Sequence, residues 1–240
     1  MDIAINSLVE GARAATGAVG IIDVFRAFTT AAVAFANGAS RIVMVGSVEE
    51  AVALRASGDV QFCMGEVRGR RPDVFDFGNS PFEVSTIAFH GQSIAQRTSA
   101  GTQGIVSARG ASRLYATSLV IATATARALA SGGAAGGAPG APDRITLVAM
   151  GNAGVERTDE DELCAIHIRN ILQGRSGDAA AVRQLILAGG EAAGFRDPAN
   201  PNRHPGDLEI ALDVDRYDFA IRVTVEDGRP VARMERHRAA

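Results

Sequence analysis

The stretch VGIIDVFRAFTTAAVAFA spans residues 19–36 and contains the transition that decides the fold class. Val19 to Ile22 is an apolar run that predicts a buried strand, and Ala27 to Ala36 predicts a helix that ends at Gly38. Open α/β sheets bind their ligands at the carboxyl ends of strands. Asp23 and Arg26 follow such an end and are therefore candidate site residues. The simpler alternative is that Asp23 caps the helix and Arg26 pairs with it.

The composition favours a single α/β domain over residues 1–240. The chain has 240 residues, of which 47% are hydrophobic and only 5% aromatic, so its core must consist mainly of Ala, Val, Ile and Leu. Such a core suits helices packed on a largely parallel or mixed sheet. A low-complexity segment, SGGAAGGAPGAP at 131–142, predicts a flexible loop within this domain.

The charge pattern limits the possible ligands. The formal net charge is −3 and no basic block is present, so nucleic acid is not an expected partner. All 24 basic residues are arginine, and the absence of lysine excludes a Schiff base, a pyridoxal anchor and a P-loop lysine. An anionic ligand would therefore be held by arginine, by backbone N–H groups or by a metal ion.

The cysteines and the N-terminus predict an intracellular protein. Cys63 and Cys164 belong to no CxxC or zinc pattern, so we expect two free, buried thiols in a reducing cytoplasm. No signal peptide and no apolar run of membrane-spanning length is apparent, so no membrane partner is expected. A homodimer is expected only because soluble enzymes are commonly dimeric.

A second carboxylate follows a second predicted strand. Val60 to Met64 is apolar, and Gly65 and Glu66 come directly after it. Glu66 thus occupies the same position in its strand as Asp23 does, which favours a role in the site. A solvated loop glutamate is the alternative. Gly11 to Gly20, by contrast, is rich in Gly and Ala, contains no GxGxxG, and predicts a loop.

Two predicted helix starts could bind an anion through their N–H groups. In the segment GNSPFE at 78–83, Ser80 is a good N-cap, Pro81 suits the first helical position and Glu83 completes a capping box. The turn TSAGT at 98–102 also precedes a predicted helix. Many helices begin in this way without a ligand, so each signal is weak alone.

A third acidic position precedes the helix predicted over Leu163 to Leu172. The apolar strand RITLVAM at 144–150 is followed by Asp159-Glu160-Asp161-Glu162. Acidic residues in a first helical turn are favoured by the helix dipole, so capping alone would explain them. The functional alternative is that Asp161 and Glu160 help bind a hard cation. Asp207 is expected to cap a short helix, and residues 219–234 predict a hairpin.

Taken in order, these motifs resemble the 2-phosphosulfolactate phosphatase (ComB) family. The ordered set is IIDVFRAFTT, Gly65-Glu66, FDFGNSP, the TSAGT turn and DEDELCA, and it extends from about Ile21 to the strand at Phe219. The resemblance implies a ComB-like three-layer α/β/α fold. It also implies a Mg²⁺-dependent phosphatase that acts on the phosphate ester of a small 2-hydroxy acid. The family's reaction converts 2-phosphosulfolactate to sulfolactate in coenzyme M biosynthesis.

Two positions depart from the family pattern. The family's Thr-Thr-Asn-Gly-Thr turn is Thr98-Ser99-Ala100-Gly101-Thr102 here, so Ala100 replaces an asparagine that could contact substrate. Ile166 replaces a small residue after the acidic helix start. The first change concerns the identity of the substrate more than the type of reaction.

The resulting hypothesis gives each candidate a role. The expected catalytic residues are Asp23, Arg26 and Glu66. Asp23, Glu66, Glu160 and Asp161 are expected to lie on neighbouring strand ends and to bind Mg²⁺. The ion would polarise the phosphoryl group and orient an attacking water. The expected substrate-binding residues are Asn79, Ser80, Thr98, Ser99, Gly101 and Thr102. A covalent aspartyl-phosphate on Asp23 is a less favoured alternative.

Two other functions compete with this hypothesis. Asp213-Val214-Asp215 after an apolar stretch could indicate a haloacid-dehalogenase-type phosphatase. That mechanism needs a catalytic lysine and a long following domain, and this sequence shows neither. A non-catalytic binder of a small phosphorylated or sulfonated anion is the alternative of a different class. Three carboxylates around an anion disfavour it, because they would need a cation between them.

Overall fold

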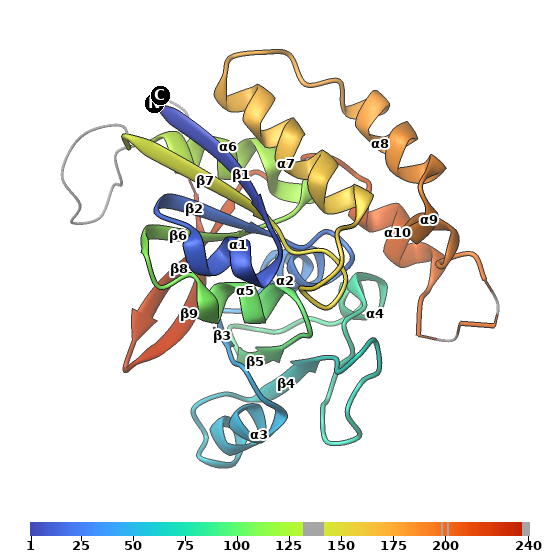
Figure 1. Cartoon of the computed structure of the whole chain (residues 1–240). Helices are drawn as coiled ribbons and strands as arrows, with labels where there is room; N and C mark the ends of the chain where they lie inside the picture. Colours follow the sequence, from blue (N-terminus) through green and yellow to red (C-terminus); the bar gives the residue numbers. More distant parts are fainter. Residues whose placement is uncertain (132–141, 198, 201, 237–240) are drawn as a thin grey trace.

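The computed structural model describes residues 1–131, 142–197, 199–200 and 202–236. Within them the chain forms one nine-stranded mixed sheet with helices around it (Figure 1). The strands are β1 (Asp2–Ser7), β2 (Gly17–Ile22), β3 (Arg41–Met44), β4 (Phe62–Gly65), β5 (Ser93–Arg97), β6 (Ala111–Thr117), β7 (Arg144–Ala149), β8 (Ala220–Glu226) and β9 (Arg229–Glu235). The α/β fold class is thereby confirmed, whereas the loop predicted at 131–142 falls, apart from its ends, outside the described residues.

The helices follow the strands in the rhythm that the sequence predicts. They are α1 (Leu8–Ala14), α2 (Ala27–Ala36), α3 (Val48–Ala56), α4 (Pro81–Ser85), α5 (Gly101–Ser107), α6 (Ala122–Ala130), α7 (Asp159–Leu172), α8 (Ala179–Ala188), α9 (Gly190–Ala193) and α10 (Pro205–Ala211), with a short 3₁₀ turn at Leu119–Ile121. No helix in the described ranges is both long enough and apolar enough to cross a bilayer.

The sheet has two parallel halves, which the C-terminal hairpin joins. Its order is β1-β7-β2-β6-β8-β9-β3-β5-β4. The pairs on either side of the hairpin are parallel, but β6–β8, β8–β9 and β9–β3 are antiparallel. Three antiparallel pairings therefore reverse the direction of β3, β4 and β5 relative to β2.

This topology corrects the expectation that the site lies on neighbouring strand ends. Five strands separate β2, which precedes Asp23, from β4, which precedes Glu66. The segment after β5 links the two strand ends, because the N–H of Ser99 donates to Glu66 and the N–H of Gly101 donates to Asp23. The ends of two distant strands therefore meet at one site.

Alternating residues of β2 show why helices cover both faces of the sheet. Val19 and Ile21 enter the core that packs under α1, α2 and α5, whereas Ala18 and Ile22 enter the core under α6 and α7. At the other end of the sheet, α3 covers the face opposite to α2. The layers are therefore helix, sheet, helix.

The prediction of a loop over Gly11 to Gly20 is wrong. The segment contains the end of α1 and the start of β2. Its glycines are required by close packing rather than by a flexible turn. A Cβ at Gly11 would lie 2.9 Å from the Cβ of Asn6, and one at Gly17 would lie 2.3 Å from the carbonyl oxygen of Arg144. Gly17 also has a positive φ of 78°.

Candidate active site

Asp23 receives two backbone hydrogen bonds just beyond the end of β2. Its Oδ1 accepts from the N–H of Ala27 at 2.9 Å, and its Oδ2 accepts from the N–H of Gly101 at 2.8 Å. Asp23 therefore stabilises the starts of both α2 and α5. Burial, with a further contribution from the negative charge of Glu66, raises the pKa of Asp23 from 3.8 to about 6. The capping role is thus present, but in a carboxylate that is costly to keep ionised.

Glu66 is an anchored, buried side chain. It is 7% exposed, follows β4, and accepts hydrogen bonds from the Ser99 N–H, from the Ser99 hydroxyl at 3.0 Å and from the Gly69 N–H at 2.6 Å. The alternative of a solvated loop glutamate is therefore wrong. These contacts join the loop after β4 to the loop after β5, which carries Gly101 toward Asp23.

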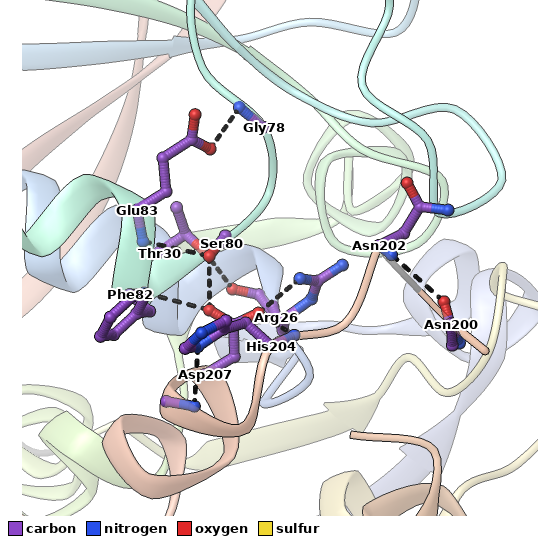
Figure 2. Close-up of polar contacts among 11 residues, drawn as sticks. Arg26, Thr30, Gly78, Ser80, Phe82, Glu83, Asn200, Asn202, His204 and Asp207 are labelled. Atoms are coloured by element: carbon purple, nitrogen blue, oxygen red, sulfur yellow. Dashed lines mark hydrogen bonds and ion pairs between the residues drawn. The ribbon is translucent and has the colours of Figure 1, made fainter. Parts of the chain in front are cut away.

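Arg26 pairs with Asp207 rather than with Asp23. Its Nη1 donates to Asp207 Oδ2 at 2.6 Å, and both residues are buried (Figure 2). Asp207 also accepts from the Ser80 hydroxyl and from the N–H groups of Phe82, at 3.0 Å, and His204, at 3.3 Å. One carboxylate therefore connects the loop after β2 with the starts of α4 and α10.

Asp207 was expected only as a helix cap. It does complete a capping box at α10, where His204 is the N-cap. Its contacts with Arg26 and Ser80 had no signal in the sequence, because an aspartate near a helix start is ordinary wherever the helix packs. Only the complete burial of this side chain distinguishes it from a surface cap.

The candidate residues line two adjoining cavities. The smaller has a volume of about 100 Å³ and is lined by Asp23, Glu66, Arg26, Asn79, Ser99 and Arg203, among others. The larger has a volume of about 380 Å³ and is lined by Arg26, Asn79, Ser80, Arg71, His204 and Asp207, among others. Arg26, Gly69 and Asn79 contribute to both, so the two cavities adjoin, and together they are called the recess below.

Asn79 and Ser80 both face this recess but differ in how their polar groups are used. The Ser80 hydroxyl accepts from the Glu83 N–H at 3.1 Å, as predicted for an N-cap, and donates to Asp207. Asn79 is 8% exposed, and its Oδ1 has no hydrogen-bond partner. An unpartnered buried acceptor beside a cavity is a natural contact for a bound molecule.

In the TSAGT turn, one residue lines a cavity and the polar groups of three others make contacts within the protein. Ser99 lines the smaller cavity. Thr98 and Thr102 instead bond to each other's backbone N–H groups at 3.1 and 2.8 Å, and they line neither cavity. The Gly101 N–H is taken by Asp23. The polar groups of Thr98, Gly101 and Thr102 thus hold the turn in shape, and the substrate-binding role expected of these residues stays a prediction.

The acidic start of α7 is buried, so it is more than a solvated cap. Asp161 accepts from the N–H groups of Val24 at 2.7 Å and Gly151 at 2.8 Å. Glu160 accepts from the Thr158 hydroxyl at 2.7 Å, and its Oε2 has no partner. Burial raises the pKa of Glu160 from 4.5 to about 7. Burial and the charges of Glu160 and Asp23 raise the pKa of Asp161 well above its ordinary value.

Comparison with known proteins connects this recess to a family. A family model described as 2-phosphosulpholactate phosphatase matches residues 4–193. The chain belongs to this family. The resemblance inferred from the ordered motifs is thereby confirmed.

Individual relatives carry the name of the same family. The chain is 30% identical over 212 residues to a probable 2-phosphosulfolactate phosphatase of Bacillus subtilis strain 168, an alignment that covers 87% of each chain. It is 31% identical over 160 residues to the protein of that name from Thermotoga maritima, covering 67% of this chain and 65% of the relative. A Symbiobacterium thermophilum protein of the same name is 42% identical over 115 residues, which cover 46% of this chain and 48% of the relative.

The four carboxylates expected to bind Mg²⁺ do not form one ligand set. Among the described residues, no three His, Cys, Asp or Glu side chains are placed to share a metal ion. Glu160 and Asp161 line neither cavity, whereas Asp23 and Glu66 both line the smaller one. Mg²⁺ commonly takes one or two carboxylates and keeps several waters. The Asp23 and Glu66 pair fits such a hydrated cation, which would relieve the repulsion between them.

Proposed function

We propose that this member of the 2-phosphosulfolactate phosphatase family is a Mg²⁺-dependent phosphatase of small 2-hydroxy acid esters. The favoured reaction is hydrolysis of 2-phosphosulfolactate to sulfolactate and phosphate, a step expected in coenzyme M biosynthesis. One observation carries the proposal: Asp23, Glu66 and Arg26 line a single cavity of about 100 Å³. Two acids and an arginine around a volume of this size match a cation and a phosphoryl group better than a large organic ligand.

The residues of the recess have separate tasks in this reaction. Asp23 and Glu66 would hold Mg²⁺, which when bound supplies Lewis-acid polarisation of the phosphoryl oxygens. Arg26, held at Nη1 by Asp207, keeps its other N–H groups for those oxygens. The Ser99 hydroxyl lies at the cavity beside Glu66. The unpartnered Oδ1 of Asn79 would accept a hydrogen bond from the attacking water.

The chemical step is a substitution at phosphorus. The water oxygen forms a bond to phosphorus, the bond between phosphorus and the ester oxygen breaks, and a proton reaches the departing 2-hydroxyl group. Preorganised N–H donors aimed at the phosphoryl oxygens stabilise the charge in this transition state. Direct attack by water is favoured over an aspartyl-phosphate because both Asp23 oxygens already accept backbone hydrogen bonds.

The test is phosphate release from a panel of small esters, with Mg²⁺ and with EDTA. The panel contains 2-phosphosulfolactate, 2-phospholactate, phosphoglycolate and 3-phosphoglycerate. We expect release that requires the metal and is fastest with 2-phosphosulfolactate. Release only from another 2-phospho acid would retain the reaction and change the substrate. Binding of these anions without any release would favour the non-catalytic binder instead.

A further inference from the structure

Two arginines lie against the same aromatic ring at the smaller cavity. The Cζ atoms of Arg26 and Arg203 are 5.8 and 5.1 Å from the centroid of the Phe195 ring. Phe195 is 2% exposed and packs edge-on against Phe25, with a centroid separation of 4.9 Å. Both guanidinium groups thus lie within cation–π distance of one buried ring.

Arg203 is held in a manner that parallels Arg26. Its Nη2 donates to Glu191 Oε2 at 2.8 Å, and its Nη1 donates to the Glu191 carbonyl at 3.2 Å. Gly194 gives the guanidinium room, because a Cβ there would lie 2.5 Å from Arg203 Nη1. The planar guanidinium carries five N–H donors. A carboxylate therefore orients each arginine and leaves donors for a ligand.

The charges around the smaller cavity exceed what a simple phosphate ester needs. Arg26, Arg68 and Arg203 line it together with Asp23 and Glu66, which gives three positive groups and two negative ones. A cation bound by the two acids would make the recess more positive still. Arg26 follows Asp23 on the same loop and is assigned to the phosphoryl group, and Arg68 is exposed. Arg203, which Glu191 anchors, is therefore the arginine available for a second anion.

We propose that Arg203 binds the second acid group of the substrate, a sulfonate or carboxylate near the phosphorylated carbon. It would thereby select acidic phosphoesters over simple ones. The inference rests on the proposed phosphatase function and deepens it. Arg203 also lies beyond residue 193, where the family match ends, so the family motifs do not include it.

The kinetic test compares two esters of a secondary alcohol, 2-phosphosulfolactate and isopropyl phosphate, which has no acid group. In Arg203→Gln we expect KM for 2-phosphosulfolactate to rise about 10- to 100-fold, because a charge-assisted hydrogen bond is lost. The kcat for that ester and both constants for isopropyl phosphate should stay within about threefold. Arg203→Lys should recover only part of the loss, since an ammonium lacks the planar fork.

A second variant moves the arginine without removing it. Gly194 has an ordinary helical φ of −62°, so Gly194→Ala should fold. Its added methyl group must displace the Arg203 guanidinium, which is the flexible end of a side chain. We expect a smaller rise in KM in the same direction. Arg127→Gln is the matched control, since Arg127 is an exposed arginine that pairs with Asp218 away from the recess.

A binding measurement tests this inference independently of the proposed phosphatase function. By calorimetry, Arg203→Gln should weaken the binding of sulfolactate about 10- to 100-fold but leave inorganic phosphate unchanged. This result would support the inference even if the wild type hydrolysed no ester. Equal losses for sulfolactate and phosphate, or an unchanged affinity for sulfolactate, would overturn it. The absence of sulfolactate binding to the wild type would also overturn it.

Discussion

Arg26 donates to Asp207 over 2.6 Å although 181 positions separate the two residues in the chain. The pair is buried, and its aspartate also bonds to Ser80 and Phe82 at the start of α4 (Figure 2). The guanidinium that faces both cavities is therefore oriented by the segment that carries α10. Formation of the recess depends on the C-terminal part of the chain being in place.

Asp207→Asn should reduce both activity and stability. The substitution leaves Arg26 buried without its counter-charge, a change that costs about 3–5 kcal/mol when a buried pair is broken. We expect the free energy of unfolding in urea to fall by an amount of this order and kcat/KM to fall at least 100-fold. Asp213→Asn is the control, because its pair with Arg216 is exposed, and it should change stability by at most about 1 kcal/mol. Equal behaviour of the two variants would contradict the role of Asp207.

Asp23→Asn should abolish phosphate release while the protein remains folded. The amide removes one of the two negative charges of the smaller cavity. Its single oxygen can also replace only one of the two carboxylate oxygens that now accept N–H bonds. The measurement is turnover at saturating Mg²⁺, with circular dichroism to verify the fold. Asp218→Asn, at an exposed ion pair, should retain full activity. Normal turnover in Asp23→Asn would refute the site.

Gly101→Ala should disturb the carboxylate without changing any polar group. Its Cβ would lie 2.8 Å from Asp23 Oδ2, 2.9 Å from the Cβ of Ala27 and 3.0 Å from Cζ of Phe28. Crowding of this kind commonly costs about 1–3 kcal/mol. We expect a lower melting temperature and a loss of kcat. Gly190→Ala is the control, because apart from its chain neighbours and the backbone of its own helix no atom lies within 4 Å of the new methyl group. An effect as large there would exclude the steric explanation.

Glu160→Gln should stabilise the metal-free protein at alkaline pH and have little effect at acidic pH. The folded-state pKa of Glu160, about 7, lies above its ordinary value of 4.5. The folded protein therefore retains a proton that the unfolded chain has lost, and stability falls as the pH rises from about 4.5 to 7. The neutral amide avoids this loss. We expect a gain of about 1–3 kcal/mol at pH 8.5 over the wild type.

The measurement is urea unfolding in EDTA at pH 5 and pH 8.5. At the lower pH the wild-type Glu160 is protonated in the folded state, so the two proteins should differ little. Glu156→Gln provides a control at an exposed carboxylate on the loop before α7. A gain that is the same at both pH values would show that the substitution acts through packing and not through the buried charge.

Much of the local structure was predictable because it depends on neighbouring residues. The apolar run before Asp23, the capping residue Ser80 and the C-terminal hairpin are all found where the pattern places them. The segment around Gly17 was not predictable. Its glycines are required by contacts with Asn6 and Arg144, and such contacts leave no periodic signal in the sequence.

The sequence by itself determined the α/β class, the family and the positions of Asp23 and Glu66 after two apolar strands, because hydrophobic periodicity and turn residues act over short distances. Only the tertiary structure decided that the β8–β9 hairpin separates those strands and that both acids nevertheless line one cavity. It also decided that Arg26 pairs with Asp207 rather than with Asp23. The physical reason is that strand order and buried ion pairs arise from contacts between residues far apart in the chain.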